Sequence, residues 1–172
     1  MNHKEDLPKK LNYLMIVTSN NIFSKIEKGE EFEDLSGSLA EEIITKSGNE
    51  FLGRIYLPNN INLIRKKIEE VLSEGKADVI LVSGGTGPSP RDVTVEAISP
   101  LFEKTLPGFG ELFRFLSYRE IGSSAIASRA IAGIARKALI FLLPGSPDAV
   151  KLALKEIIIQ EAPHLIKMIR GW

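Results

Sequence analysis

The sequence contains no cysteine, and this absence excludes several kinds of functional site. Disulfides, thiolate zinc sites, iron–sulfur clusters and cysteine nucleophiles all require a residue type that the 172-residue chain does not have. Histidine is almost as scarce, because only His3 and His164 occur and they lie near opposite ends of the chain. We therefore expect neither a cysteine-based site nor a metal site built from histidines.

An excess of charge of one sign and long apolar runs are also missing. The 22 basic and 22 acidic residues cancel, which argues against a nucleic-acid partner held by bulk electrostatics. No stretch approaches the roughly 18 consecutive apolar residues of a transmembrane helix. Residues 1–10 are charged and lack the apolar centre of a signal peptide. We therefore expect a cytoplasmic protein with neither a membrane partner nor a nucleic-acid partner.

Strand-like and helix-like segments alternate along the chain, which predicts a polar tail over residues 1–10 and one α/β domain over residues 11–172. We expect three layers: a mostly parallel sheet with helices on both faces and an antiparallel edge pair formed by a hairpin. We also expect a polar loop at 19–33, a helix that Ser36 or Ser38 caps, and a tight turn at 107–110. The predicted strands are 11–18, 51–57, 79–82, 131–135 and 139–143; the predicted helices lie around 39–44, 61–74, 93–101, 111–116, 123–130, 148–160 and 163–170.

A glycine-rich run directly after the strand at 79–82 is the most informative segment. Gly84, Gly85 and Gly87 surround Thr86, and glycines at the carboxyl end of a buried strand let backbone N–H groups approach a phosphate or a flat polar ligand. The run fits neither the P-loop nor the dinucleotide-binding pattern. The prolines that follow make the loop stiffer than a plain turn requires, so we predict that it binds a ligand.

The charged pair after this loop has two readings at each position. Asp92 is placed either to cap the following helix or to hold Mg²⁺ through water and take part in catalysis. Arg91 is placed either to bind a phosphate through two hydrogen bonds or to form a surface ion pair.

A second turn repeats the design of a buried strand, a glycine, a hydroxyl and a helix N-terminus. Pro144, Gly145 and Ser146 either start a helix or present backbone N–H groups to an anion. Two such turns at one sheet edge would face the same ligand. Ser117 and Ser128 either line the same site or are ordinary satisfied polar residues.

Taken in order, these motifs resemble the molybdenum-cofactor biosynthesis family that includes the MoaB and MogA proteins and the G domains of gephyrin and its plant relatives. The resemblance covers about residues 11–169, and residues 113–117 with 120–122 look most similar to the MoaB branch. The matching pieces are Gly84-Gly85-Thr86-Gly87, Arg91-Asp92-Val93-Thr94, Pro107-Gly108-Phe109-Gly110-Glu111, Ser128-Arg129-Ala130 and Leu143-Pro144-Gly145-Ser146-Pro147.

This resemblance implies a molybdopterin-binding fold, usually trimeric and often hexameric in the MoaB branch. It also implies Mg²⁺-dependent transfer of AMP from ATP to the terminal phosphate of molybdopterin, before molybdate or tungstate is inserted. Molybdopterin, ATP, further copies of the chain and other cofactor-assembly proteins are the implied partners. From the residues themselves we also expect an obligate oligomer, because one small core does not need Phe109, Phe113, Phe115 and the apolar terminal helix as well.

The resemblance further implies roles for individual residues. Asp92 matches the catalytic aspartate, with Mg²⁺ as its metal. Thr86, Ser117 and Ser128 match positions associated with molybdopterin. With the two glycine turns added, the predicted molybdopterin-binding residues are Gly84, Gly85, Thr86, Gly87, Arg91, Ser117, Ser128, Pro144, Gly145 and Ser146. Asp34, Ser36 and Gly37 match an Asp-x-Ser-Gly element on the nucleotide side, and the predicted nucleotide-binding residues are Ser19, Asn20, Asp34, Ser36 and Gly37.

Two positions depart from the family pattern. Family members often carry an aspartate after the proline that ends the second strand, where this chain has Asn59, and Ser-Asp after the first strand, where it has Ser19-Asn20. We predict Asp92 and Asn59 as the catalytic residues, although the Asn59 amide supplies no negative charge and coordinates Mg²⁺ weakly. Two functions therefore stay open: a molybdopterin adenylyltransferase, and a non-catalytic molybdopterin-binding or carrier protein of the same pathway.

Overall fold

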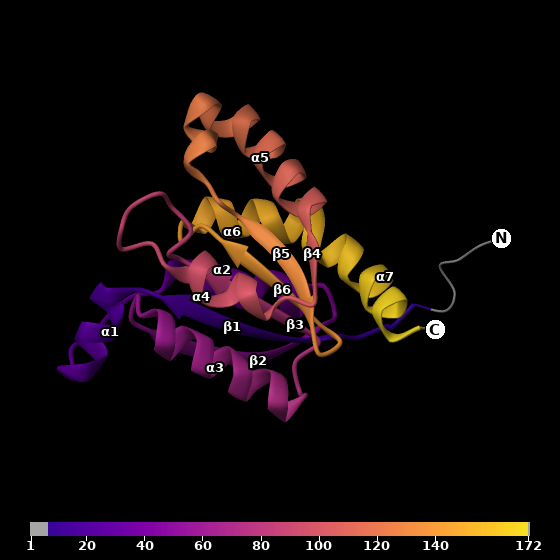
Figure 1. The fold of residues 1–172 in the computed structure, drawn as a ribbon, viewed down its shortest axis with the longest axis horizontal. Coiled ribbons are helices and arrows are strands. Elements are labelled where there is room, and N and C mark those ends of the chain that lie inside the picture. Colours follow the sequence, from indigo (N-terminus) through magenta and orange to yellow (C-terminus); the bar gives the residue numbers. More distant parts are fainter. Residues whose placement is uncertain (1–6, 172) are drawn as a thin grey trace.

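A six-stranded sheet forms the centre of the computed structural model, which describes residues 7–171 (Figure 1). Its strands lie in the order β2-β1-β3-β6-β5-β4. The first four in that order are parallel, and β5 runs antiparallel to both β6 and β4. The strands are β1 (Asn12–Thr18), β2 (Glu50–Leu57), β3 (Val79–Ser83), β4 (Lys104–Leu106), β5 (Ile131–Ala135) and β6 (Ala138–Leu143).

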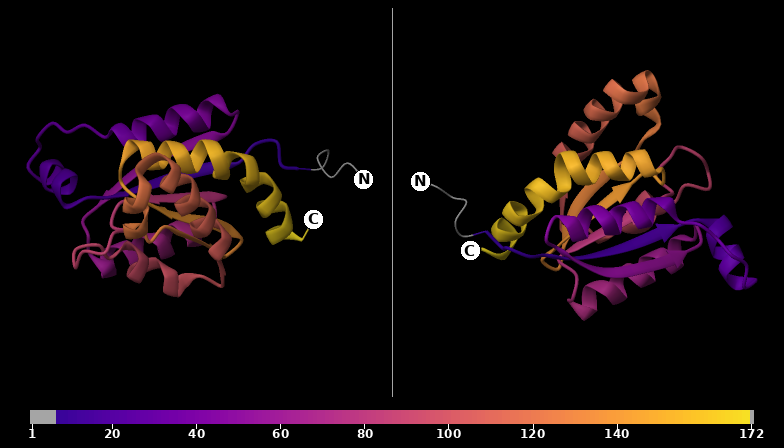
Figure 2. Two further views of the ribbon diagram at one scale, coloured as in Figure 1. Left: turned by 90° about the horizontal axis from the view of Figure 1, so that it is seen from above. Right: turned by 180° about the vertical axis from the view of Figure 1, so that it is seen from behind.

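Helices cover both faces of this sheet, which confirms the predicted three-layer α/β fold (Figure 2, left). One face packs against α2, α5 and the α6–α7 run, and the other packs against α3 and α4. The helices are α1 (Asn20–Glu27), α2 (Leu35–Lys46), α3 (Ile61–Glu74), α4 (Thr94–Ile98), α5 (Pro107–Ile121), α6 (Pro147–Ala153) and α7 (Ile159–Arg170). Shorter 3₁₀ turns occupy Ser99–Leu101 and Gly122–Ala127. None of the helices within residues 7–171 is long and apolar enough to cross a lipid bilayer.

The central strand β3 explains why two separate apolar cores form. Val79 and Leu81 point into the core beneath α2 and α5, whereas Ile80 and Val82 point into the core beneath α3 and α4. All five residues of β3 are buried, as a parallel strand covered by helices on both faces requires. The apolar run seen in the sequence is therefore a strand with two inward faces.

The predicted polar loop at 19–33 is wrong in its first part, because α1 occupies residues 20–27. Ser19 caps this helix by accepting a hydrogen bond from the Ile22 amide over 3.2 Å. The helix has only eight residues and none of them is buried, so it is shorter than the window of about 11 residues over which helical periodicity is read.

The predicted turn at 107–110 is also wrong, because these residues are the first turn of α5. Pro107 starts the helix, where its missing N–H costs nothing. Gly110 reflects close packing: a Cβ there would lie 2.5 Å from the Ala130 carbonyl oxygen. Phe109 packs on Phe141 with 5.0 Å between ring centroids.

Other differences are smaller. The strand β4 was not expected, so two antiparallel pairings stand in place of one. The two predicted terminal helices form one continuous helical run. A π-helical segment at Leu154–Ile158 joins α6 to α7, and Pro163 lies inside α7. This run bends between α6 and α7 (Figure 2), as π segments and prolines both allow. Residues 1–6 of the expected polar tail lie outside the described residues.

Candidate functional site

The carboxyl ends of β1, β2, β3 and β6 meet at one edge of the sheet. Neighbouring strand ends are joined there by backbone hydrogen bonds, from the Ser19 amide to Leu57 and from the Gly84 amide to Leu143, each over 2.9 Å. Open α/β sheets bind their ligands at this edge. The structure therefore places both predicted glycine turns where a ligand is expected.

Close packing at the start of the glycine loop requires two consecutive glycines. Gly84 and Gly85 have φ angles of 101° and 68°, a region that other residues rarely adopt. A Cβ on Gly84 would collide with the Thr18 carbonyl oxygen, and one on Gly85 would collide with the Thr94 hydroxyl. Buried Thr94 holds the turn in place by donating to the Gly84 carbonyl oxygen over 2.7 Å.

A cavity of about 310 Å³, which we call the glycine-loop cavity, lies beside this turn. Its walls come from the glycine loop, α5, the turn Gly122–Ala127 and the start of α6. The predicted residues that line it are Gly85, Thr86, Gly87, Asp92, Ser117, Ser128, Pro144, Gly145 and Ser146. The structure therefore brings together nearly all residues predicted for one ligand.

A second cavity, of about 330 Å³ and called the α2 cavity here, opens at the same sheet edge between β1, β3 and the start of α2. Its wall contains three of the residues predicted to bind the nucleotide, Ser19, Asp34 and Ser36. Gly84 of the glycine loop also lines it. Gly145 lines both cavities. The two predicted binding regions are thus adjacent.

Asp92 does not cap α4, which corrects one of its two expected roles. The cap position of that helix is Val93, which makes no side-chain cap hydrogen bond. Instead the Asp92 carboxylate accepts a hydrogen bond from the Ser89 amide over 3.0 Å and faces the glycine-loop cavity. Gly87 makes room for it, because a Cβ there would lie 2.7 Å from the Asp92 carboxylate.

The cap of α2 is Asp34, in place of the expected Ser36 or Ser38. Its carboxylate accepts from the Gly37 amide over 2.8 Å and from the Tyr56 hydroxyl over 3.0 Å. The guanidinium of Arg54 adds an ion pair at 3.3 Å. Burial raises the pKa of the Tyr56 phenol, so this hydroxyl stays a donor at neutral pH. The Asp34 carboxylate thus has a structural role as well as facing the α2 cavity.

Four predicted residues line neither cavity. Gly37 lies in the first turn of α2, where its amide donates to the Asp34 carboxylate. The exposed Arg91 is absent from both walls, so its proposed phosphate contact stays a prediction. Asn20 and Asn59 hydrogen-bond to each other: the backbone N–H of Asn59 donates to the side-chain oxygen of Asn20 over 2.8 Å. The side-chain oxygen of Asn59 is buried without a hydrogen-bond partner in the described part of the chain.

Sequence reasoning missed several wall residues. Thr18 and Ser83 end β1 and β3 and line the α2 cavity, and Ser83 has a buried hydroxyl without a hydrogen-bond partner among the described residues. Their position at strand ends was the available signal. Phe113 and Ser124 line the glycine-loop cavity, but they come from segments whose distance from the glycine turn only the fold reveals.

The metal-binding capacity of the site rests on few carboxylates. Within residues 7–171 no group of three or more His, Cys, Asp or Glu side chains is arranged to hold a metal ion. Among the described residues, Asp92 is the one acidic residue on the wall of the glycine-loop cavity. Mg²⁺ commonly binds proteins through one or two carboxylates together with substrate phosphates and water, so this donor set fits a Mg²⁺ that arrives with a phosphate ligand.

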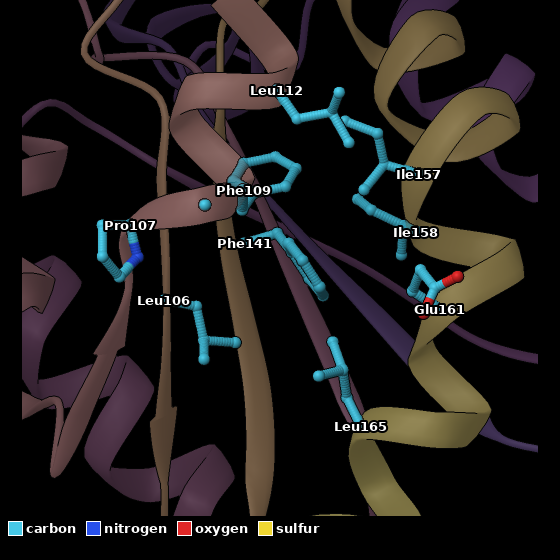
Figure 3. Close-up of a pocket in the computed structure, with 10 residues that line it drawn as sticks. Leu106, Pro107, Phe109, Leu112, Phe141, Ile157, Ile158, Glu161 and Leu165 are labelled. Carbon is cyan, nitrogen blue, oxygen red and sulfur yellow. The ribbon is translucent and has the colours of Figure 1, made fainter.

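A third cavity, of about 320 Å³, is apolar and lies apart from the predicted site (Figure 3). It opens between α5, β6 and the α6–α7 run, and Glu161 is its one charged wall residue among those described. Figure 3 shows Leu112, Phe109 and Leu165 along its walls. No predicted site residue lines it, and because nearly all its wall residues are apolar this cavity offers little polar chemistry.

Comparison with known proteins places the chain in a family. Residues 14–164 match the family model described as a probable molybdopterin binding domain. The chain is 38% identical over 169 residues to molybdenum cofactor biosynthesis protein B of Bacillus subtilis, covering 98% of this chain and 95% of that protein. It is 41% identical over 172 residues to the molybdopterin adenylyltransferase of Pyrococcus furiosus, covering 98% and 96%.

Solved structures agree with this result. The crystal structure of the tungsten cofactor synthesizing protein MoaB from Pyrococcus furiosus superimposes with a TM-score of 0.82 and 40% identity, covering 95% of this chain and 99% of that one. The chain belongs to the molybdopterin-binding domain family that includes the MoaB proteins.

Proposed function

We propose that this protein is a molybdopterin adenylyltransferase of molybdenum or tungsten cofactor biosynthesis. The observation that carries the proposal is the pair of adjacent cavities that share Gly145 at one sheet edge. An enzyme that joins two substrates must hold both with their reacting groups close together. The name of the Pyrococcus furiosus relative, molybdopterin adenylyltransferase, supports the same reaction.

In the proposed reaction, molybdopterin occupies the glycine-loop cavity and ATP occupies the α2 cavity. An oxygen of the terminal molybdopterin phosphate attacks the α-phosphorus of ATP. A new P–O bond joins AMP to molybdopterin, the bond to the β-phosphate oxygen breaks, and pyrophosphate leaves. Because several negative charges come together, catalysis depends mainly on positioning and charge stabilisation.

The chain's own groups divide this work between the cavities. Backbone amides of Gly85 to Gly87 hold the molybdopterin phosphate, and Ser117 and Ser128 hydrogen-bond to the rest of that substrate. Asp92 is the carboxylate for Mg²⁺, which when bound neutralises charge on phosphate oxygens. Ser19 and Ser36 lie in the α2 cavity, where their hydroxyls bind the nucleotide.

A non-catalytic molybdopterin carrier is the second candidate. It is favoured by the Asn20–Asn59 pair, which places two neutral amides where carboxylates would add charge. The unpartnered Asn59 oxygen is compatible with either candidate, because an amide oxygen still accepts a hydrogen bond or coordinates a cation weakly.

The decisive experiment is an adenylyl-transfer assay with purified protein, molybdopterin and Mg-ATP. Adenylylated molybdopterin and pyrophosphate at many turnovers per chain are the expected result. Tight molybdopterin binding without product would support the carrier, and neither binding nor product would contradict both candidates.

We also propose that the chain self-associates as a trimer or hexamer. Phe109 and Phe113 no longer support this idea, because both are buried in the chain's own core. Support comes instead from Leu112 and Phe115, which are 45% and 55% exposed, and from the apolar cavity beside Leu112. Light scattering at micromolar concentration tests this proposal, and a stable monomer would contradict it.

A further inference from the structure

The segment that carries Asp92 is tied to the rest of the protein at few points. Within residues 86–92, hydrogen bonds between Ser89 and Asp92 and between Ser89 and Arg91 connect the loop only to itself. Among the described residues, every hydrogen bond from this segment to another part of the chain involves Arg129. Thr94 fixes the two ends of the loop through the Gly84 and Gly85 carbonyl oxygens, and between these ends Arg129 is the residue that hydrogen-bonds the loop to the rest of the described chain.

Arg129 contacts the loop through its backbone and its side chain. Its amide donates to the Thr86 carbonyl oxygen over 3.0 Å, and its Nε donates to the Gly87 carbonyl oxygen over 2.9 Å. Its Nη2 donates to the Asp92 carbonyl oxygen over 3.2 Å. The guanidinium therefore spans the loop from Gly87 to Asp92.

A carboxylate fixes the orientation of this guanidinium. Glu96 of α4 accepts hydrogen bonds from Nη1 and Nη2, the latter over 3.2 Å. Such a half-exposed ion pair adds little stability by itself. Its geometric effect is larger, because a planar guanidinium held at one end directs its remaining N–H groups in fixed directions.

Arg129 also follows Ser128, so the same residue connects two walls of the glycine-loop cavity. Ser128 lies on one wall, and Thr86, Gly87 and Asp92 lie on the other. We infer that Arg129 is a positioning residue, which holds the Asp92 loop at a fixed distance from the Ser128 wall. This inference rests on the proposed function, since it assigns the purpose of that spacing to adenylyl transfer.

The variant Arg129→Ala tests the inference, with Arg65→Ala as a matched control. Arg65 also donates to two backbone carbonyl oxygens of α4, those of Ala97 and Glu96, but neither bond involves the Asp92 loop. We expect Arg129→Ala to lower kcat by about 10- to 100-fold, the usual effect of losing a group that orients a metal ligand. The KM for ATP changes little, and Arg65→Ala keeps the kcat of the unaltered protein.

A double-mutant cycle separates positioning from general loss of structure. If Arg129 acts through Asp92, adding Arg129→Ala to Asp92→Asn lowers kcat further by no more than about twofold. An equal loss of kcat in both backgrounds would overturn the inference. If Arg129→Ala does not fold, Arg129→Lys replaces it, because an ammonium group keeps the charge but cannot span the same oxygens.

Amide hydrogen exchange gives a test that needs no turnover. Arg129→Ala should increase exchange at Gly87, Ser89, Arg91 and Asp92, whereas Arg65→Ala should leave these amides as they are. Unchanged exchange in Arg129→Ala would overturn the inference. If the unaltered protein shows no turnover, the proposed function fails, and the exchange data still decide whether Arg129 holds the loop.

Discussion

The Ser36 hydroxyl donates a hydrogen bond to the Gly145 carbonyl oxygen over 2.7 Å, although 109 residues separate the two in the sequence. Ser36 stands at the start of α2, in the wall of the α2 cavity, and Gly145 belongs to both cavities. This one bond therefore joins the proposed nucleotide and molybdopterin sites. It is the most direct physical link between the two proposed substrates.

Removing this link should affect both substrates. We expect Ser36→Ala to raise the KM for ATP and the KM for molybdopterin severalfold, since one buried hydrogen bond contributes about 1 kcal/mol. Initial rates at varied concentrations of each substrate measure the effect. Ser38→Ala is the control, because Ser38 lies on the exposed side of the same helix and contacts Arg54. Equal kinetics for the two variants would contradict the proposed link.

The carboxylate of Asp92 is the group we expect to matter most for turnover. Asp92→Asn keeps the size of the side chain and an oxygen that can accept from the Ser89 amide, so the loop should retain its shape. We expect kcat to fall by about a hundredfold or more, the scale for losing one electrostatic contact to a transition state. Molybdopterin affinity, measured by equilibrium binding, should stay within about threefold of the unaltered protein, since shape and hydrogen bonds are kept.

Asp148→Asn provides the control for this charge change. Asp148 is exposed in the first turn of α6 and lines neither cavity. The Asp148→Asn variant should keep the kcat of the unaltered protein. A kcat for Asp92→Asn equal to that of Asp148→Asn would remove Asp92 from the proposed mechanism.

The glycine loop could be predicted from sequence because its signals are local. Val79 to Val82 and the glycines after them are neighbours in the chain, and their pattern alone indicates a buried strand that ends in a close-approach turn. The role of Asp92 was harder to predict. An aspartate at this position can either cap the following helix or accept a hydrogen bond from the Ser89 amide within the loop. The contact of Arg129 with Gly87, 42 residues away, was beyond sequence reasoning because only the fold brings them together.

Gly85 allows a stability test of the same loop. Alanine at this position must adopt a φ of 68° and collide with the Thr94 hydroxyl. Left-handed backbone in a residue other than glycine costs about 1–2 kcal/mol, and the collision adds to it. We expect Gly85→Ala to lower the free energy of unfolding by more than 2 kcal/mol, measured by urea denaturation.

Gly75 offers a matched comparison. It ends α3 with a φ of 66°, and a Cβ there would meet nothing within 4 Å. Gly75→Ala should therefore show only the backbone cost, about 1–2 kcal/mol. The difference between the two variants measures the close approach of the loop to Thr94. Equal free energies of unfolding would mean that the loop relaxes away from Thr94 without cost.

Asn59 decides between the two candidate functions. Its side-chain oxygen is buried without a partner in the described residues, and its backbone is held by Asn20. Asn59→Asp restores a negative charge at nearly constant volume beside the proposed nucleotide site. If the missing charge limits the reaction, kcat should rise by about tenfold or more, since electrostatic contacts to the transition state have effects of this order. An unchanged, measurable kcat would show that the amide suffices. Activity that appears only in Asn59→Asp would identify the natural chain as a molybdopterin carrier with a lost catalytic group.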